Sequence, residues 1–180
     1  MKKIIFFVLS ITFLFIVSHL EAKKIKYETI EYSLPNNFTK VDCFNPTINK
    51  KCHMYRHSGR YTQSEDLPMT AVLAVVIEDQ DFKSSDMLDS QKRLMKLETI
   101  KQVTEFIAFE KYNTQIFAVN YLLRDNNITW WISSFAWVWK GKGYVFELKI
   151  PYSPSHKEYI NLKMIMTGVV RKFLKTLVFN

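Results

Sequence analysis

Residues 128–151 narrow the choice of folds more than any other segment, because they predict two long strands, the first of which is apolar on both faces. The segment reads ITWWISSFAWVWKGKGYVFELKIP, and the turn between its strands falls at GKG. In the first strand Trp131, Phe135 and Trp137 share one face, and Ile132 lies on an equally apolar opposite face. The alternation that would leave one face in water is missing. We therefore expect other elements to cover the hairpin on both sides.

All four tryptophans lie within residues 130–139, and this concentration has two interpretations. If a helix covers each face of the sheet, the rings belong to the core, and Ser133, Ser134 and Ala136 let a helix approach closely. If one face is only partly covered, the rings and nearby lysines form an exposed surface suited to a protein partner, a lipid surface or a sugar polymer. The partner-binding residues of this second interpretation are Trp131, Trp137, Trp139, Lys140 and Lys142.

The rest of the chain predicts more strands than helices. A continuous run of β-branched and small residues at 69–79 predicts a central strand covered on both faces. Further strands are expected at residues 25–32, 38–45, 51–57, 102–111 and 114–125. Because the connections between successive strands are too short for parallel crossovers, we expect a mostly antiparallel sheet.

Two segments have helical periodicity. Ser84 and Ser85 are candidate N-caps for a helix over residues 86–99. A long C-terminal helix follows Ser155, which forms a predicted capping box with Glu158. Its apolar stripe consists of Leu162, Ile165, Met166, Val169, Val170, Phe173, Leu174 and Leu177. The expected fold class is α+β, a mostly antiparallel sheet with helices packed on it and a long C-terminal helix.

Residues 1–22 predict a targeting segment rather than a part of the folded domain. Two lysines precede an apolar run at 4–17, and Ala22 is a small residue suited to the position before a cleavage site. We interpret residues 1–22 as a secretory signal peptide and residues 23–180 as a single periplasmic or secreted domain. The alternative is an uncleaved anchor, although the apolar run is short for a span of about 20 residues.

Cys43 and Cys52 predict one disulfide, because an even cysteine count in an exported chain indicates an oxidised pair. The segment between them contains the turn formers Asn45, Pro46 and Asn49, so its ends can meet. A redox-active pair is usually spaced Cys-x-x-Cys, and thiol chemistry is therefore not indicated.

The formal net charge is +8, and the lysines are scattered rather than clustered. Export and the lack of a basic stripe argue against nucleic acid as a partner. A basic exported protein suits anionic lipid, a cell-wall polymer or an acidic protein partner. Weak contact with a membrane surface fits the same charge.

Candidate catalytic residues are few. His53 and His57 lie four apart on a predicted strand and, with Asp42, are candidate ligands of a metal-dependent hydrolase, but a metal site needs further ligands at fixed geometry. The acidic group EDQD at residues 78–81 lacks the spacing of a calcium loop. The sequence has no phosphate-binding glycine loop and no nucleophile motif, so it indicates neither a cofactor nor an enzymatic reaction.

A resemblance to a known family rests on four short motifs. These are LPNNF at 34–38, GKGYVFELKIP at 141–151, SPSHKEY at 153–159 and INLKMIMTGVV at 160–170. Their order resembles the PsbP-like superfamily, including the exported bacterial DcrB-like proteins, over residues 27–173. The resemblance implies an α/β/α sandwich around an antiparallel sheet, and an accessory or binding role without enzymatic activity. It supplies no catalytic residue.

These observations predict an exported binding or accessory protein that acts on a protein partner in the cell envelope. The expected contact surface is the strand at 131–139 with the neighbouring loop at 58–68. An inhibitor or immunity-type protein against a toxin or a wall-degrading enzyme is the most specific form of this hypothesis. The alternatives are a metal-dependent hydrolase using His53, His57 and Asp42, and an envelope protein that rests on lipid through its basic helix.

Overall fold

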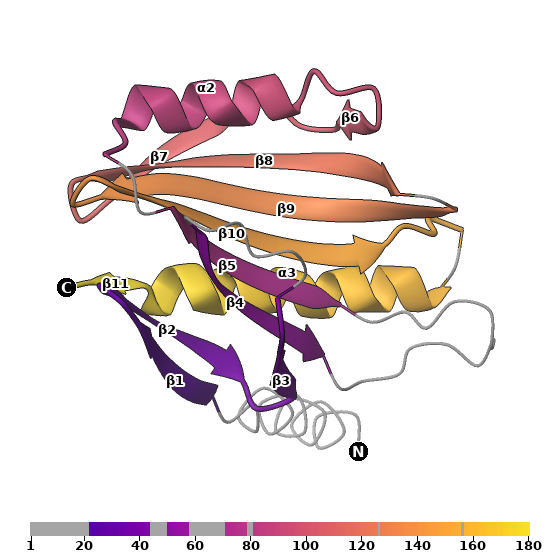
Figure 1. Ribbon diagram of the computed structural model, residues 1–180. Helices are drawn as coiled ribbons and strands as arrows, with labels where there is room; N and C mark the ends of the chain where they lie inside the picture. The colour runs from indigo at the N-terminus through magenta and orange to yellow at the C-terminus, as the bar shows by residue number, and fades with distance from the viewer. Residues whose placement is uncertain (1–21, 44–49, 58–70, 79–80, 126, 156) are drawn as a thin grey trace, which may run out of the picture.

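The computed structural model describes residues 22–43, 50–57, 71–78, 81–125, 127–155 and 157–180, and this part of the chain forms two sheets and two helices (Figure 1). The large sheet contains β3 (Phe38–Val41), β4 (Lys50–His57), β5 (Val72–Glu78), β6 (Ile100–Gln102), β7 (Ile107–Lys111), β8 (Thr114–Asp125), β9 (Ile128–Trp139) and β10 (Lys142–Pro151). The small sheet contains β1 (Ala22–Tyr27), β2 (Ile30–Pro35) and β11 (Val178–Phe179). The helices are α2 (Ser84–Leu94) and α3 (Lys157–Thr176).

The large sheet is built around the β9–β10 hairpin that the sequence predicts. Its strand order is β3-β4-β5-β10-β9-β8-β6, with β7 also paired to β8, and all of these pairs are antiparallel. The hairpin turn places Lys140 at φ 50° and Gly141 at φ 76°, a left-handed pair that matches the twist of the flanking strands. Because β5 and β8 flank the hairpin, both of its strands lie inside the sheet.

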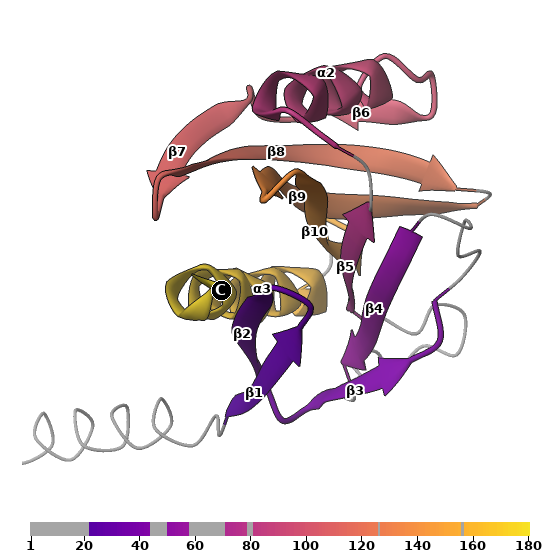
Figure 2. The same cartoon turned by 60° about the vertical axis from the view of Figure 1, so that its left-hand side comes forward.

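Each face of the large sheet carries one helix (Figure 2). α2 lies over the face that contains Ile132, where Val119 and Tyr121 complete a small core and Leu94 and Met95 pack against it. α3 lies over the opposite face, where it also contacts β2 and β10. The two helices thus lie over opposite faces of the hairpin.

α3 contributes one wall of the larger core. Its buried residues recur at helical spacing and are Tyr159, Leu162, Met166, Val169, Phe173 and Leu177. Phe146 of β10 stacks on Phe173 with ring centroids 3.9 Å apart, and Tyr32 of β2 packs against the same ring. Ile165 is 40% exposed, so the predicted stripe is wrong at that position, because the buried side of the helix is narrower than expected. None of the helices in the described residues is long and apolar enough to cross a membrane.

The predicted single strand at residues 25–32 is wrong, because the structure divides it into β1 and β2. Glu28 and Thr29 form the turn, with Glu28 at φ 51°. Non-glycine residues rarely adopt positive φ, and neither residue is a typical turn former, so no local signal marks the turn. Its support comes from elsewhere in the chain, since Nζ of Lys51 lies 2.9 Å from Oε1 of Glu28.

Two other strand boundaries differ from the sequence expectation. The predicted strand at 102–111 is two strands, β6 and β7, because residues 103–106 interrupt the regular pairing with β8: the main-chain N–H groups of Val103 and Thr104 both donate to the carbonyl of Asn120. β11 was not expected, since two residues are too few to show a periodic pattern.

The helix predicted over residues 86–99 ends earlier, at Leu94. Its N-cap is Lys83 rather than one of the two predicted serines. The main-chain N–H of Lys83 donates to Oδ2 of Asp86 at 2.9 Å, and this carboxylate also suits the positive end of the helix dipole.

The predicted disulfide is confirmed: Cys43 and Cys52 are bonded, with Cα atoms 6.2 Å apart. Cys52 belongs to β4 and Cys43 follows β3, so the bond ties the edge strand of the large sheet to its neighbour. β3 has only four residues, and the covalent link adds to the few hydrogen bonds that hold it.

Replacement of both Cys43 and Cys52 by serine should destabilise the protein by about 2–3 kcal/mol, because a cross-link over a loop of about ten residues restricts the unfolded chain. Urea denaturation of the wild type and the double variant, each with and without reductant, measures the effect. Reductant should lower the stability of the wild type to that of the variant and leave the stability of the variant unchanged. A double variant as stable as the oxidised wild type would contradict this role.

Gly168→Ala should stabilise the protein by about 0.5–1 kcal/mol, because glycine is a poor helix former. A Cβ added at Gly168 meets no atom within 4 Å. Gly141→Ala is the matched control and should destabilise, since Gly141 has φ +76° and its Cβ would lie 3.1 Å from the carboxylate of Asp81. Thermal denaturation of both variants tests the pair, and a loss of stability in Gly168→Ala would show that the outer side of α3 is not open.

Candidate functional site

Trp137 lies in the core. Its side chain is 0% exposed and stacks on Tyr144 with ring centroids 5.4 Å apart, while the ring of Phe173 lies 6.4 Å away. Phe179 of β11 packs on the same indole. The expectation that Trp137 belongs to an exposed partner-binding surface is therefore wrong, because α3 and β11 close this part of the sheet face.

Trp139 and Lys140 contact residues 179 and 180. Trp139 stacks on Phe179 with ring centroids 5.0 Å apart, and its Nε1 donates to the main-chain oxygen of Asn180 at 3.3 Å. Nζ of Lys140 donates to the same oxygen at 2.9 Å. Both side chains therefore hold β11 in place, and any role in partner binding stays a prediction.

Lys142 contacts the turn between β1 and β2. Its Nζ lies 3.8 Å from Oε2 of Glu28, the carboxylate that Lys51 also approaches. Exposed ion pairs of this kind contribute little to stability one by one. Their geometric effect is to connect the small sheet with β4 and β10, and a role for Lys142 in partner binding also stays a prediction.

Trp131 lines an open groove between α3 and the large sheet, which we call the α3 groove. The α3 groove has a volume of about 240 Å³. It is lined by Asn120, Trp131, Ser133, Phe135, Leu148, Ile150, Lys163, Met166, Thr167 and Val170. A concave, mostly apolar site with a few polar groups is the usual form of a binding site in proteins.

The floor of the α3 groove has a polar row between two aromatic positions. Ser133 of β9 pairs with Asn120 of β8, and its hydroxyl donates to Oδ1 of Asn120 at 2.7 Å. Trp131 and Phe135 lie on either side of this row, because every second residue of a strand points to the same face. An occupant of the groove would therefore meet polar atoms at the middle and aromatic rings at both ends.

Lys163 of α3 lies over Trp131, with its ammonium nitrogen 3.8 Å from a ring centroid. No carboxylate among the residues that the structure describes forms an ion pair with Lys163, so its charge is open to an incoming anion. Tyr159, one turn earlier, is 4% exposed, and burial raises its pKa to about 12. Lys163 lies outside the predicted apolar stripe of this helix, and its approach to Trp131 depends on how α3 crosses the sheet.

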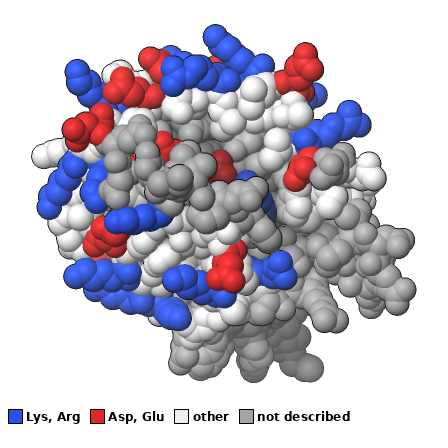
Figure 3. Space-filling view, in the orientation of Figure 1, with Lys and Arg blue, Asp and Glu red and all other residues white. Residues whose placement is uncertain are grey.

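The face shown in Figure 3 carries no continuous basic stripe. Lys and Arg side chains alternate there with Asp and Glu, including over α2 at the top of the view. A nucleic-acid interface needs a positive track that follows the phosphate backbone. On this face, charges of both signs are therefore mixed.

The predicted metal ligands do not converge. His53 stacks on Tyr27 with ring centroids 3.6 Å apart, and its Nδ1 lies 3.2 Å from the hydroxyl oxygen of Tyr55. His57 is buried, at 3% exposure, further along β4. Among the described residues, which include Asp42, no three potential metal ligands come together. The hypothesis of a metal site on these three residues is therefore wrong.

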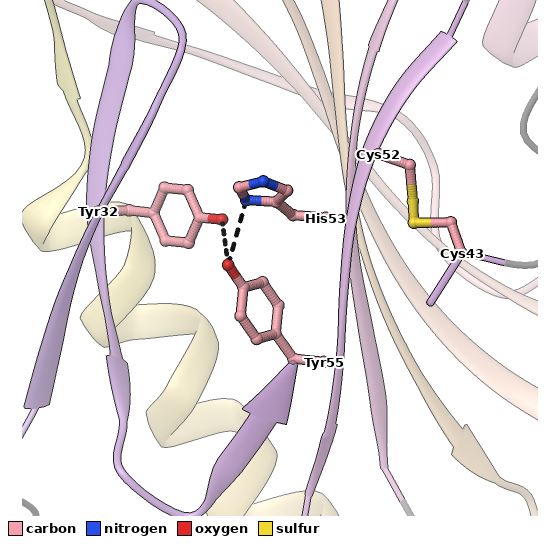
Figure 4. Close-up of a disulfide and its surroundings, with 5 residues drawn as sticks. All are labelled: Tyr32, Cys43, Cys52, His53 and Tyr55. Atoms are coloured by element: carbon pink, nitrogen blue, oxygen red, sulfur yellow. Dashed lines mark hydrogen bonds between the residues drawn. A yellow bond between two sulfur atoms is a disulfide. The ribbon is translucent and has the colours of Figure 1, made fainter. Parts of the chain in front are cut away.

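The hydroxyl of Tyr55 lies between Tyr32 and His53, on the side of β4 opposite the disulfide (Figure 4). The hydroxyl oxygens of Tyr32 and Tyr55 are 3.3 Å apart. Burial raises the pKa of both tyrosines, and burial with the nearby charge of Lys40 lowers the pKa of His53. A neutral His53 accepts a hydrogen bond from Tyr55, so the cluster joins β2 of the small sheet to β4 of the large sheet.

Several predicted features lie outside the described residues: the loop at 58–68, Asp79, His156 and residues 1–21 of the expected signal peptide. Of the remaining acidic group, Glu78 ends β5 and Asp81 is exposed beyond it.

No protein-family model matches the sequence, and no curated protein does. Solved structures share its fold. LpqN, involved in cell envelope biogenesis of Mycobacterium tuberculosis, is 10% identical, with 91% of this chain and 93% of that chain covered and a TM-score of 0.57. Cyanobacterial PsbP (CyanoP) from Synechocystis is 15% identical, with 91% and 95% covered and a TM-score of 0.57. The Ran-binding protein Mog1p of Saccharomyces cerevisiae is 12% identical, with 89% and 96% covered and a TM-score of 0.55.

These similarities concern the fold, because the identities are low. They confirm the PsbP-like fold that the motif order predicts. A specific relation to the DcrB-like proteins stays a prediction.

Stability should fall as the pH is lowered below about 6.5. His53 then binds a proton in the unfolded chain, whereas in the folded protein its lowered pKa keeps it neutral to lower pH. His53→Phe keeps a ring on Tyr27 but cannot titrate, so it should reduce the loss of stability between pH 7.5 and pH 5.5. Urea denaturation at both pH values measures this difference. An equal loss in wild type and variant would exclude His53 as its source.

Proposed function

We propose that this protein is an exported, non-enzymatic binding protein that contacts a protein partner in the cell envelope through the α3 groove. The observation that carries the proposal is the open groove with the half-buried rings of Trp131 and Phe135 at its ends. Aromatic side chains contribute large contact areas with little conformational entropy to lose, and tryptophan is enriched among residues that dominate protein interfaces.

The shared fold supports a binding or accessory role. Mog1p is a Ran-binding protein, and LpqN takes part in cell envelope biogenesis. The disulfide fits an oxidising compartment outside the cytoplasm, as the expected signal peptide does. A helix on each face of the large sheet fits the α/β/α sandwich that the family resemblance implies.

The proposed contact surface is narrower than the strand at 131–139. Trp137 is buried and the side chains of Trp139 and Lys140 hold β11, so Trp131 and Phe135 supply the aromatic contact. An inhibitor or immunity-type role remains the most specific form of the proposal. A hydrolase on His53, His57 and Asp42 loses its support, because these side chains form no metal site.

Site-specific photo-crosslinking tests the proposal. Thr167 lines the groove and is exposed, so Thr167→p-benzoylphenylalanine should give a discrete protein adduct in an envelope extract after irradiation. Glu98 is exposed after α2, beyond the other face of the sheet, and Glu98→p-benzoylphenylalanine is the matched control. Mass spectrometry identifies the adduct, and calorimetry with the purified partner then measures the affinity.

Thr167→Arg, which fills the groove from an exposed position, should weaken binding of that partner at least tenfold, as blocking a central contact does. Adducts of equal strength at both positions, no adduct at Thr167, or unchanged affinity of Thr167→Arg would each contradict binding through the groove.

A further inference from the structure

The α3 groove has the length of a short extended peptide. Its helical wall runs from Lys163 to Val170, seven residues or about 10 Å along α3. Trp131 and Phe135 are four residues apart on β9, which corresponds to about 13 Å. Three or four residues of extended chain span the same distance.

The polar row of the floor requires a polar occupant at the middle of the groove. Oδ1 of Asn120 accepts from Ser133, and the side-chain nitrogen Nδ2 of Asn120 makes no hydrogen bond to another described residue. Thr167 donates its proton to the carbonyl of Lys163, which leaves lone pairs on its oxygen. An occupant without polar groups would bury these atoms without hydrogen-bond partners, which opposes its binding.

An extended main chain satisfies this requirement, whereas a helix and an acyl chain do not. A helix uses its N–H and C=O groups internally, and an acyl chain has none. An extended segment offers free N–H and C=O groups to the middle of the groove. Every second side chain then points toward the floor, so apolar side chains near the two ends of the segment can reach Trp131 and Phe135.

The charges beside the groove are positive. Lys163 lies over Trp131 and has no acidic partner among the described residues. Lys101 of β6 pairs with Leu122 of β8, which pairs with Trp131 of β9, so the three residues lie side by side across the sheet. Arg124 lies two residues beyond Leu122 on β8 and therefore on the same face of the sheet. Lys101 and Arg124 are both exposed.

We propose that the α3 groove binds an extended, acidic segment of a protein, with apolar side chains against Trp131 and Phe135 and a carboxylate on Lys163. This inference rests on the proposed function and adds the chemistry of the bound segment. Charge complementarity at Lys163 sets the preference for acidic sequences, and the polar floor sets the preference for an extended main chain.

Selection from a random seven-residue peptide library on the folded, disulfide-bonded protein tests the inference. Enriched peptides should combine Asp or Glu with large apolar residues. Lys163→Glu should weaken a selected peptide at least tenfold and shift a new selection toward Lys and Arg. Lys175→Glu makes the same charge change on an exposed site near the far end of α3, and should leave the selection and the affinity unchanged.

The affinity of a selected peptide should also fall as salt rises from 0.05 to 0.5 M, because ions screen the contact with Lys163. Vesicles of phosphatidylglycerol and phosphatidylcholine are the second probe. Binding to vesicles without enrichment of peptides would overturn the inference in favour of a lipid. The inference would also be overturned if the selected peptides were neutral or basic, if no peptide were enriched, or if Lys163→Glu did not change the selected sequences.

The two proposals can fail separately. If the partner crosslinked at Thr167 binds through the groove but the selected peptides are not acidic, only the inference about the segment fails. If acidic peptides bind at Lys163 but no partner crosslinks at Thr167, the groove is a peptide site and the proposed envelope partner fails.

Discussion

The β9–β10 hairpin is the constraint on which the rest of the structure depends. One face of the hairpin is apolar along both strands and the other is apolar along β9, so neither can be left in water without exposing hydrophobic surface. One face is closed by α2 and the other by α3 together with the small sheet. The α3 groove lies where this second cover is incomplete, because α3 closes the sheet over Trp137 but leaves Trp131 and Phe135 half-buried. The candidate site is thus the part of the hairpin that the fold does not fully cover.

The parts of the fold that were predictable are those with a local pattern. Gly141 marks the turn of the β9–β10 hairpin in the sequence. Apolar residues that recur at helical spacing predict the buried side of α3. The β1–β2 turn was not predictable, because Glu28 adopts positive φ with the help of Lys51, a contact between distant segments. β11 is held by Trp139 in the same long-range way.

The candidate site was predicted only in part. The sequence identified the tryptophan strand, but alternation alone does not tell an exposed ring from a buried one when both faces are apolar. Trp137 and Trp131 share a face of β9, and the positions of α3 and β11 separate a core ring from a groove ring. Nothing in the sequence marked Lys163 or Asn120 as a site residue, because their meeting depends on how α3 crosses β8 and β9.

β2 lies between β1 and β11, so the small sheet pairs residues from the start of the domain with residues at 178–179. Ile30 of β2 is fully buried and pairs with Phe179, which in turn packs on Trp137. The two halves of this core are separated by most of the chain, and long-range pairing of this kind slows folding. A nascent chain cannot complete the small sheet before residues 178–180 leave the ribosome. The core around Trp137 therefore cannot be complete until β11 has paired with β2.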